Sequence, residues 1–185
     1  LVELSSAVAQ AAMDSGVATR PIADMAAYRQ KLAQFVYRTS LFMKPVYDQA
    51  RADKQRVVYA EGEEEVVLRA VQNVIDEGVA FPILIGRPDV IESRIERLGL
   101  RMKPGVDFEI TNINDDPRFN EYWQYYHGLT GRRGVTVAAA KNLLRSRPTL
   151  IAAVMVARGE ADAMLSGVVG RFHKKLGYVR SVIPL

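Results

Sequence analysis

The fold is decided by residues 56–99, which read RVVYAEGEEEVVLRAVQNVIDEGVAFPILIGRPDVIESRIERLG. Residues 56–60 are a short run rich in β-branched and aromatic side chains, and residues 63–77 repeat apolar side chains at helical spacing. Residues 81–85 are a second apolar run, and a helix that opens with proline is expected over 88–99. This repeated alternation of strand and helix predicts a parallel sheet covered by helices.

The same alternation continues toward the C-terminus. Residues 107–111 have the pattern of a third strand, and helices are expected over 119–128, 136–146 and 149–158, the last of them buried. A fourth strand is expected over 161–165. The predicted fold class is therefore α/β, with a mainly parallel sheet.

Residues 1–55 differ, because they carry helical patterns and no strand pattern. An alanine-rich helix is expected over 7–15, Asp24 can cap a second helix, and Pro45 suits the first turn of a third helix that runs to Lys54. This stretch predicts a helical connector in front of the α/β domain.

Length and composition exclude several classes of function. The 185 residues have room for one domain with a sizeable core and an appendage, but not for a complete two-domain metabolic enzyme. The absence of cysteine excludes disulfides and thiolate catalysis, and only two histidines disfavour a histidine metal site. Charges interrupt apolar runs such as 150–156 before the roughly 18 residues that span a bilayer, and no signal peptide is recognisable. A cytoplasmic protein is expected, truncated because it starts at Leu1 without Met.

The formal net charge of +4 favours an anionic ligand over nucleic acid. Basic and acidic residues are interleaved along much of the chain, as in 92–97, rather than gathered in a dense basic tract. Positive charge does concentrate near Arg132 and between Arg171 and Arg180. These positions predict a local anion site and no nucleic-acid partner.

Four loops follow the carboxyl ends of the predicted strands, where open parallel sheets bind ligands through exposed N–H groups and helix N-termini. They begin at residues 61–62, 86–87, 111–112 and 166–167. The first loop is acidic through Glu63 to Glu65, which suits a helix N-terminus but makes the loop a poor phosphate cradle.

Basic side chains follow two of the predicted turns. Arg87 can meet an anion at the start of a helix, or it can be solvated at a plain strand–turn–helix junction. Arg132 and Arg133 precede a helix that Thr136 can cap, so that an anion there would meet two guanidinium groups and free N–H donors. A solvated charged turn is the alternative.

The segment 166–180 is the most informative part of the chain for function. It follows a buried strand and combines three glycines, the hydroxyl of Ser166 and five basic groups when His173 is counted. This composition is typical of an anion-binding loop that enters a helix. It has neither the Walker spacing nor a Gly-x-Gly-x-x-Gly pattern, which disfavours ATP and dinucleotides. A solvated basic helix end remains the alternative.

Several segments together resemble a known family. Residues 58–65, 82–86, 133–136 and 159–167 resemble, in order and spacing, the phosphate acetyl/butyryltransferase family. Residues 11–22 look like the end of a bacterial malic enzyme domain. The combination resembles the phosphotransacetylase-like module that ends a bacterial NADP-dependent malic enzyme.

The resemblance implies a domain organisation. The family fold is a two-domain, three-layer α/β/α structure that transfers acyl groups between CoA and phosphate in a cleft. Residues 1–55 would be the connector from the malic enzyme domain, and residues 56–185 would be the N-terminal part of a truncated phosphotransacetylase-like domain.

The sequence departs from the pattern of active family members. They follow the Ser-Gly turn with a His-Thr-Thr run and an Arg-Pro, whereas this chain has Gly170 to His173 and then Arg180-Ser181. Thr130 also stands where active members have an arginine. Loss of small hydroxyl donors should cost catalysis more than binding. We therefore expect an acyl-CoA pocket without turnover, with an active phosphate acetyltransferase as the alternative.

The resemblance also implies partners and cofactors. The parent would oxidise and decarboxylate malate to pyruvate with NADP and Mg or Mn, using residues upstream of Leu1, and this module would bind acetyl-CoA and assemble as a homo-oligomer. A scaffold role for residues 24–54 is a third hypothesis. No catalytic or metal-binding residue is expected in the chain. The expected pocket and rim residues are Arg87, Arg132, Arg133, Ser166, Gly167, Arg171, His173 and Arg180.

Overall fold

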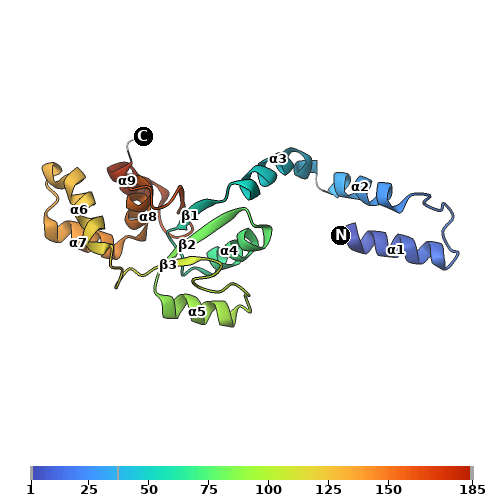
Figure 1. The fold of residues 1–185 in the computed structure, drawn as a ribbon, viewed down its shortest axis with the longest axis horizontal. Coiled ribbons are helices and arrows are strands. Elements are labelled where there is room, and N and C mark those ends of the chain that lie inside the picture. The colour runs from blue at the N-terminus through green and yellow to red at the C-terminus, as the bar shows by residue number, and fades with distance from the viewer. Residues whose placement is uncertain (1, 37, 184–185) are drawn as a thin grey trace. The chain divides into compact units, whose positions relative to one another are not determined.

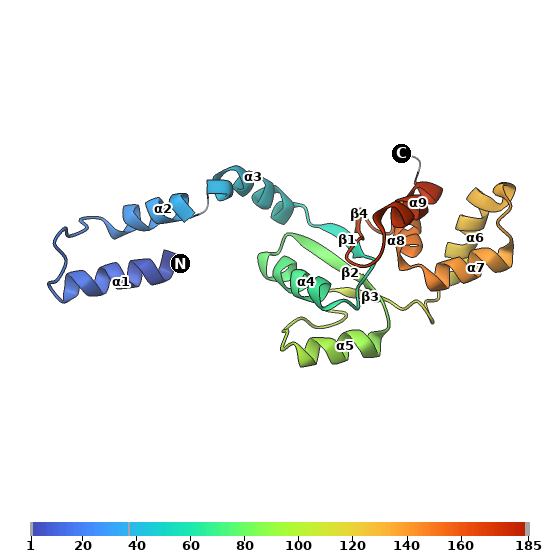
Figure 2. The same cartoon turned by 180° about the vertical axis from the view of Figure 1, so that it is seen from behind.

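The computed structural model describes residues 2–36 and 38–183, and the chain forms two compact units. The first unit is Leu1–Gln49 and the second is Ala50–Leu185. Figure 1 shows the course of the chain through both units, and Figure 2 shows the same ribbon from behind.

The first unit is helical, as the sequence predicts. Its helices are α1 (Val2–Asp14), α2 (Met25–Val36) and most of α3 (Arg38–Ala52). The predicted cap of α2 is confirmed, because a carboxylate oxygen of Asp24 accepts hydrogen bonds from the backbone N–H groups of Ala26 and Ala27 at 2.9 and 3.0 Å.

The prediction for Pro45 is wrong. Pro45 lies inside α3, which begins seven residues earlier at Arg38, and not in the first turn of a new helix. A proline inside a helix removes one backbone hydrogen bond, and the helical turns on either side of it can still form. The helix pattern from 38 onward therefore outweighs the local proline signal.

The second unit contains a four-stranded sheet in the order β3-β2-β1-β4, and every neighbouring pair is parallel. This confirms the predicted fold class. In register, Val57 lies opposite Pro82 on one side and Ala163 on the other. The strands are β1 (Gln55–Tyr59), β2 (Ala80–Ile85), β3 (Glu109–Thr111) and β4 (Ala163–Leu165).

Helices cover both faces of this sheet (Figures 1 and 2). Successive residues of β1 point to opposite faces, so that Val58 joins one buried cluster and Tyr59 the other. The cluster around Tyr59 includes apolar residues of α4 (Glu65–Glu77) and α5 (Pro88–Arg97). The cluster on the opposite face includes residues of α6 (Phe119–Thr130), α7 (Val137–Ser146), α8 (Pro148–Ala157) and α9 (Phe172–Val182). The 3₁₀ turn η1 (Gly131–Arg133) connects α6 to α7.

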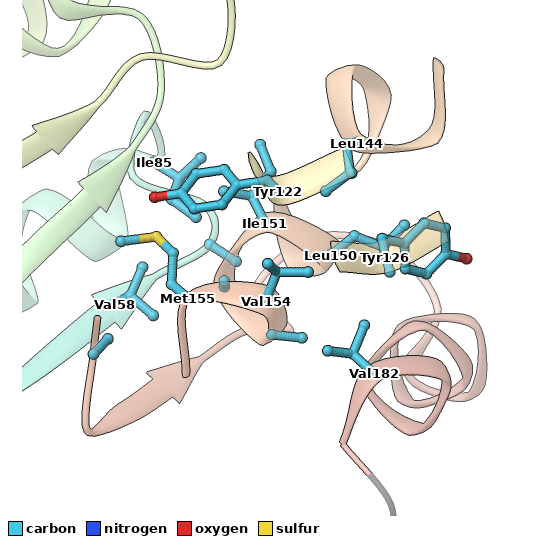
Figure 3. Close-up of a cluster of buried hydrophobic side chains, with 14 of the residues drawn as sticks. Val58, Ile85, Tyr122, Tyr126, Leu144, Leu150, Ile151, Val154, Met155 and Val182 are labelled. Atoms are coloured by element: carbon cyan, nitrogen blue, oxygen red, sulfur yellow. The ribbon is translucent and has the colours of Figure 1, made fainter. Parts of the chain in front are cut away.

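The centre of the larger core is α8, as its continuous apolar sequence predicts. Residues 149–155 of this helix are all buried. Figure 3 shows its side chains between those of Val58 and Ile85 from the sheet and those of Tyr126, Leu144 and Val182 from the surrounding helices. Each fully buried aliphatic side chain contributes about 1.5–3 kcal/mol, so this packing holds both ends of α8 in place against the sheet.

The strand order creates a switch point next to β1. The chain moves from β1 to β2 and β3 on one side, and it returns to β4 on the other side. Loops that leave neighbouring strands in opposite directions open a crevice at the carboxyl ends of the strands. The crevice is therefore expected between the loops that follow Tyr59 and Leu165.

Candidate anion-binding site

A pocket of about 650 Å³ lies at the carboxyl ends of the strands in the second unit. Its walls come from the loops after β1, β2 and β3, the junction of α7 with α8, and the first turns of α9. The lining residues include six cationic side chains and three carboxylates. The cations are Arg87, Arg145, Arg147, Arg171, Lys174 and Lys175, and the carboxylates are Glu61, Glu63 and Glu64.

The acidic wall is the loop 61–64, and Gly62 determines its path. The N–H of Gly62 donates to the carbonyl of Ile85 at 3.1 Å, and a Cβ at this position would lie 2.8 Å from that same carbonyl oxygen. Only glycine permits this approach to β2. Because the loop is held here, Glu61 reaches the end of β4 while Glu63 reaches the end of β2.

Glu63 is fully engaged by Arg87. Its carboxylate accepts two hydrogen bonds from the guanidinium at 2.9 and 2.8 Å and a third from the backbone N–H of Arg87 at 2.9 Å. These hydrogen bonds lower the pKa of Glu63 below its usual value of 4.5. Arg87 lines the pocket, but its charge is matched by Glu63 rather than left for a ligand.

Glu61 is engaged by three groups from the segment that follows β4. Its carboxylate accepts hydrogen bonds from the hydroxyl of Ser166 and the N–H of Gly167, each at 3.2 Å, and it forms an ion pair with Lys175 of α9. The Ser166 hydroxyl also lies 3.1 Å from that of Thr149 at the start of α8. Burial lowers the pKa of Lys175.

The opposite wall is basic. Arg145 stacks 5.1 Å from the ring centroid of Phe119, and Arg147 donates to the hydroxyl of Tyr178 at 2.9 Å. Arg171 and Lys174 are exposed at the start of α9. In the described part of the chain, none of these four cations forms an ion pair with a carboxylate. An anion that enters the pocket would therefore meet uncompensated positive charge on this wall.

The structure brings together only some of the expected site residues. Arg87 and Arg171 line the pocket, and Ser166 and Gly167 adjoin it through Glu61. The others lie outside the wall as described: Arg132 and Arg133 form the exposed turn η1 between α6 and α7, and His173 and Arg180 are exposed on α9. A ligand role for each of the eight remains a prediction.

Several lining residues were missed from the sequence. Arg145 and Arg147 flank Ser146 directly before Pro148, so two basic residues at the start of a buried helix were an available signal. Lys174 and Lys175 lie within the basic segment 166–180 that drew attention as a whole. The pairing of Glu61 with this segment had no local signal, because it depends on the parallel pairing of β1 with β4.

No group of three or more histidine, aspartate or glutamate side chains in residues 2–36 and 38–183 is arranged to hold a metal ion. Within the same residues, no helix is both long enough and apolar enough to cross a bilayer.

A parallel α/β sheet with a cationic pocket beside its switch point defines an α/β domain suited to anionic ligands. Residues 41–185 match the family described as "Phosphate acetyl/butaryl transferase", and the chain belongs to this family. The sequence-based resemblance is thereby confirmed.

Known relatives give the chain its wider context. It is 57% identical to the NADP-dependent malic enzyme of Escherichia coli over 182 residues, and 56% identical to that of Salmonella typhimurium. Each match covers 98% of this chain, which spans 24% of the length of either relative. A crystal structure of a phosphotransacetylase from Streptococcus pyogenes superposes with a TM-score of 0.66 at 22% identity, covering 76% of this chain and 43% of that one. This last likeness shows the fold alone.

Proposed function

We propose that this module binds an acyl-CoA, with acetyl-CoA as the first candidate, and regulates the NADP-dependent malic enzyme of which it forms part, without transferring acyl groups. The observation that carries the proposal is the basic wall, where four cations have no carboxylate partner in the described residues. Coenzyme A carries three phosphate groups, and clusters of arginine and lysine are the usual protein partners of phosphate.

The size and the position of the pocket fit such a ligand. Pockets of roughly 300–1,000 Å³ are typical of small-molecule and cofactor sites, and this one measures about 650 Å³. It opens outside the carboxyl ends of a parallel sheet, which is where open α/β sheets bind ligands. Its rim contributes the exposed cations Arg171 and Lys174.

The absence of acyl transfer is proposed from the same geometry. An acyl transferase needs donors aimed at the oxyanion that forms in the transition state. Near the end of β4, the carboxylate of Glu61 accepts from the hydroxyl of Ser166 and the N–H of Gly167 in the free protein, and a phosphate that replaced it would use the same two donors, which leaves neither of them for an oxyanion. Together with the absence of the His-Thr-Thr run after Gly167, this favours binding over turnover.

The role in the longer protein is proposed from its relatives. Two NADP-dependent malic enzymes more than half identical to this chain support a malic enzyme as the parent. We propose that this parent converts malate to pyruvate with NADP and Mg or Mn. An acyl-CoA can regulate that reaction only if it binds the active and inactive states with different affinity. We propose a cytoplasmic homo-oligomer in which the module transmits this preference to the malic enzyme domain.

Calorimetry on the full-length protein tests the binding step. Acetyl-CoA is expected to bind with a dissociation constant in the micromolar range, and the rate of malate-dependent NADPH formation is expected to change over the same concentrations. No heat of binding at millimolar acetyl-CoA would overturn the proposal. Binding without any change in the malate rate would overturn the regulatory half of it.

The alternative is an active phosphate acetyltransferase, which family membership favours. It predicts that the full-length protein forms acetyl-CoA from acetyl phosphate and free CoA. The measurement is CoA-thiol consumption, with the same preparation carrying Arg171→Met as the control for a contaminating enzyme. A rate of acetyl-CoA formation that is proportional to the concentration of this protein, and that is lost in the variant, would favour the transferase function over the sensor function.

A further inference from the structure

The contact between Glu61 and the segment after β4 has the composition of a filled anion site. The carboxylate meets one hydroxyl, one backbone N–H and one ammonium group, from Ser166, Gly167 and Lys175. The side chain of Glu61 is only 12% exposed, and that of Lys175 only 18%. Glu61 is therefore a largely buried anion among donors that converge on it from another part of the chain.

The same donors are of the kind that holds phosphate. A glycine N–H at a turn, a hydroxyl and a lysine are recurrent partners of phosphoryl oxygens. Thr149 lines the pocket and adjoins the group through Ser166. Both Glu61 and Lys175 also face the pocket. A ligand anion in the pocket is thus placed to compete with the carboxylate for these donors.

We propose that Glu61 is an internal competitor of the ligand: in the free protein its carboxylate occupies an anion subsite, and a phosphate group of the ligand displaces it. This inference deepens the proposed function and rests on it only for the identity of the natural ligand. Release of Glu61 frees Lys175, Ser166 and Gly167 together, so occupancy of the pocket is coupled to a contact between the loop after β1 and the start of α9.

A purely structural tie between β1 and β4 would use the same contacts, and Glu63 illustrates that role. Its partner Arg87 has an exposed side chain (56%), and the pair joins the ends of β2 and β1. Glu61 differs because it is paired with a largely buried lysine inside a cationic pocket. When the carboxylate of Glu61 is removed, an internal competitor predicts tighter ligand binding, whereas a structural tie predicts no gain in affinity.

The experiment compares Glu61→Gln with Glu64→Gln in the full-length protein. Glu64 lines the same pocket, and in the described residues its carboxylate has no hydrogen-bond or ion-pair partner. Both variants remove one negative charge, but only the first removes the charge that pairs with Lys175 and weakens the acceptor of Ser166 and Gly167. Pyrophosphate is titrated by calorimetry, followed by acetyl-CoA.

Glu61→Gln is expected to bind pyrophosphate about tenfold more tightly than the parent, whereas Glu64→Gln should gain no more than about twofold from the change in charge. Equal gains in the two variants, or no gain in Glu61→Gln, would overturn the inference. Tighter pyrophosphate binding with no acetyl-CoA binding in any variant would keep the inference and remove the proposed ligand.

A second variant keeps the test decisive if Glu61→Gln does not fold. Lys175→Met removes one donor and leaves the carboxylate in place, so pyrophosphate binding should weaken by about tenfold. A structural tie predicts unchanged pyrophosphate affinity in Lys175→Met, with only a lower melting temperature. That result would contradict the competition between Glu61 and the ligand.

Discussion

The two walls of the pocket use charge in opposite ways. On the acidic wall, two carboxylates of the loop 61–64 form ion pairs with Arg87 and Lys175. On the basic wall, Arg171 and Lys174 have no such partner in the described part of the molecule. Paired charges hold a geometry, whereas unpaired charges are available to a ligand. Arg171 and Lys174 are therefore available to a ligand directly, whereas Lys175 becomes available only when Glu61 is displaced.

The largest effect is expected from breaking the acidic wall at Gly62. An added Cβ would meet the backbone of Ile85 at 2.8 Å and the Cβ of Leu84 at 2.9 Å. Neither neighbour is the flexible end of a side chain, so Gly62→Ala should lower the free energy of unfolding by about 2–3 kcal/mol. Urea denaturation of the full-length protein, followed by hydrogen exchange in β1 and β2, measures this loss.

Gly128→Ala is the matched control for that prediction. Gly128 lies inside α6, and no atom lies within 4 Å of the position that its Cβ would take. Alanine is the better helix former by about 1 kcal/mol, so this variant should be neutral or more stable. A similar loss of stability in both variants would show that crowding against β2 is not the cause.

The next effect sharpens the comparison on the basic wall. Arg171→Met should weaken acetyl-CoA binding by about tenfold, because a charge-assisted hydrogen bond to phosphate is worth about 1.5 kcal/mol or more. Arg180→Met removes the same charge from within α9, which Arg171 directly precedes, at a position that does not line the pocket. Its effect should stay below about twofold in the same calorimetric titration. Equal losses would mean that overall charge, rather than the pocket wall, determines affinity.

The smallest expected effect concerns the pH dependence of the Glu63–Arg87 pair. The hydrogen bonds from Arg87 lower the folded-state pKa of Glu63 below 4.5. The pair therefore stabilises the fold above that value, and the contribution is lost as the pH falls through the folded-state pKa. The difference in unfolding midpoint between the parent and Glu63→Gln should be greatest near neutral pH and shrink below about 4.5.

Glu64→Gln serves again as the reference in that titration. Its carboxylate has no partner among the described residues. The difference in unfolding midpoint between the parent and Glu64→Gln should therefore contain no contribution from an ion pair. A Glu63→Gln difference that stays constant down to pH 3 would show that the pair contributes nothing through ionisation.

Local patterns predicted the elements of the second unit well. The apolar run before Gly86 is β2, and the apolar stretch after Thr149 forms most of the buried helix α8. Thr136 caps α7, because its hydroxyl oxygen accepts a hydrogen bond from the N–H of Ala139 at 3.2 Å. These features depend on residues within one or two turns of each other. The prediction from Pro45 was wrong because a helix can continue through a proline despite the loss of one backbone hydrogen bond.

The site was predicted less completely than the fold. The rule for strand ends located Arg87 and the segment from Ser166 to Arg171, and the structure places both at the pocket. The same rule selected the loop after β1, but its acidic residues made it a poor phosphate cradle, because carboxylates repel phosphate. The structure shows two of those carboxylates bound to pocket cations, an arrangement that charge counting along the chain does not reveal.

By itself, the sequence determined the order of strands and helices along the chain, the family, and the basic character of the segment after β4. Periodicity, motif order and composition can all be read from residues that are close together in the sequence. Only the tertiary structure decided which charges meet. Glu61 and Ser166 are 105 residues apart in the chain, and they come within 3.2 Å because β1 and β4 pair in parallel at the centre of the switch. Electrostatic partners depend on distance in space, which the pairing of strands far apart in the chain determines.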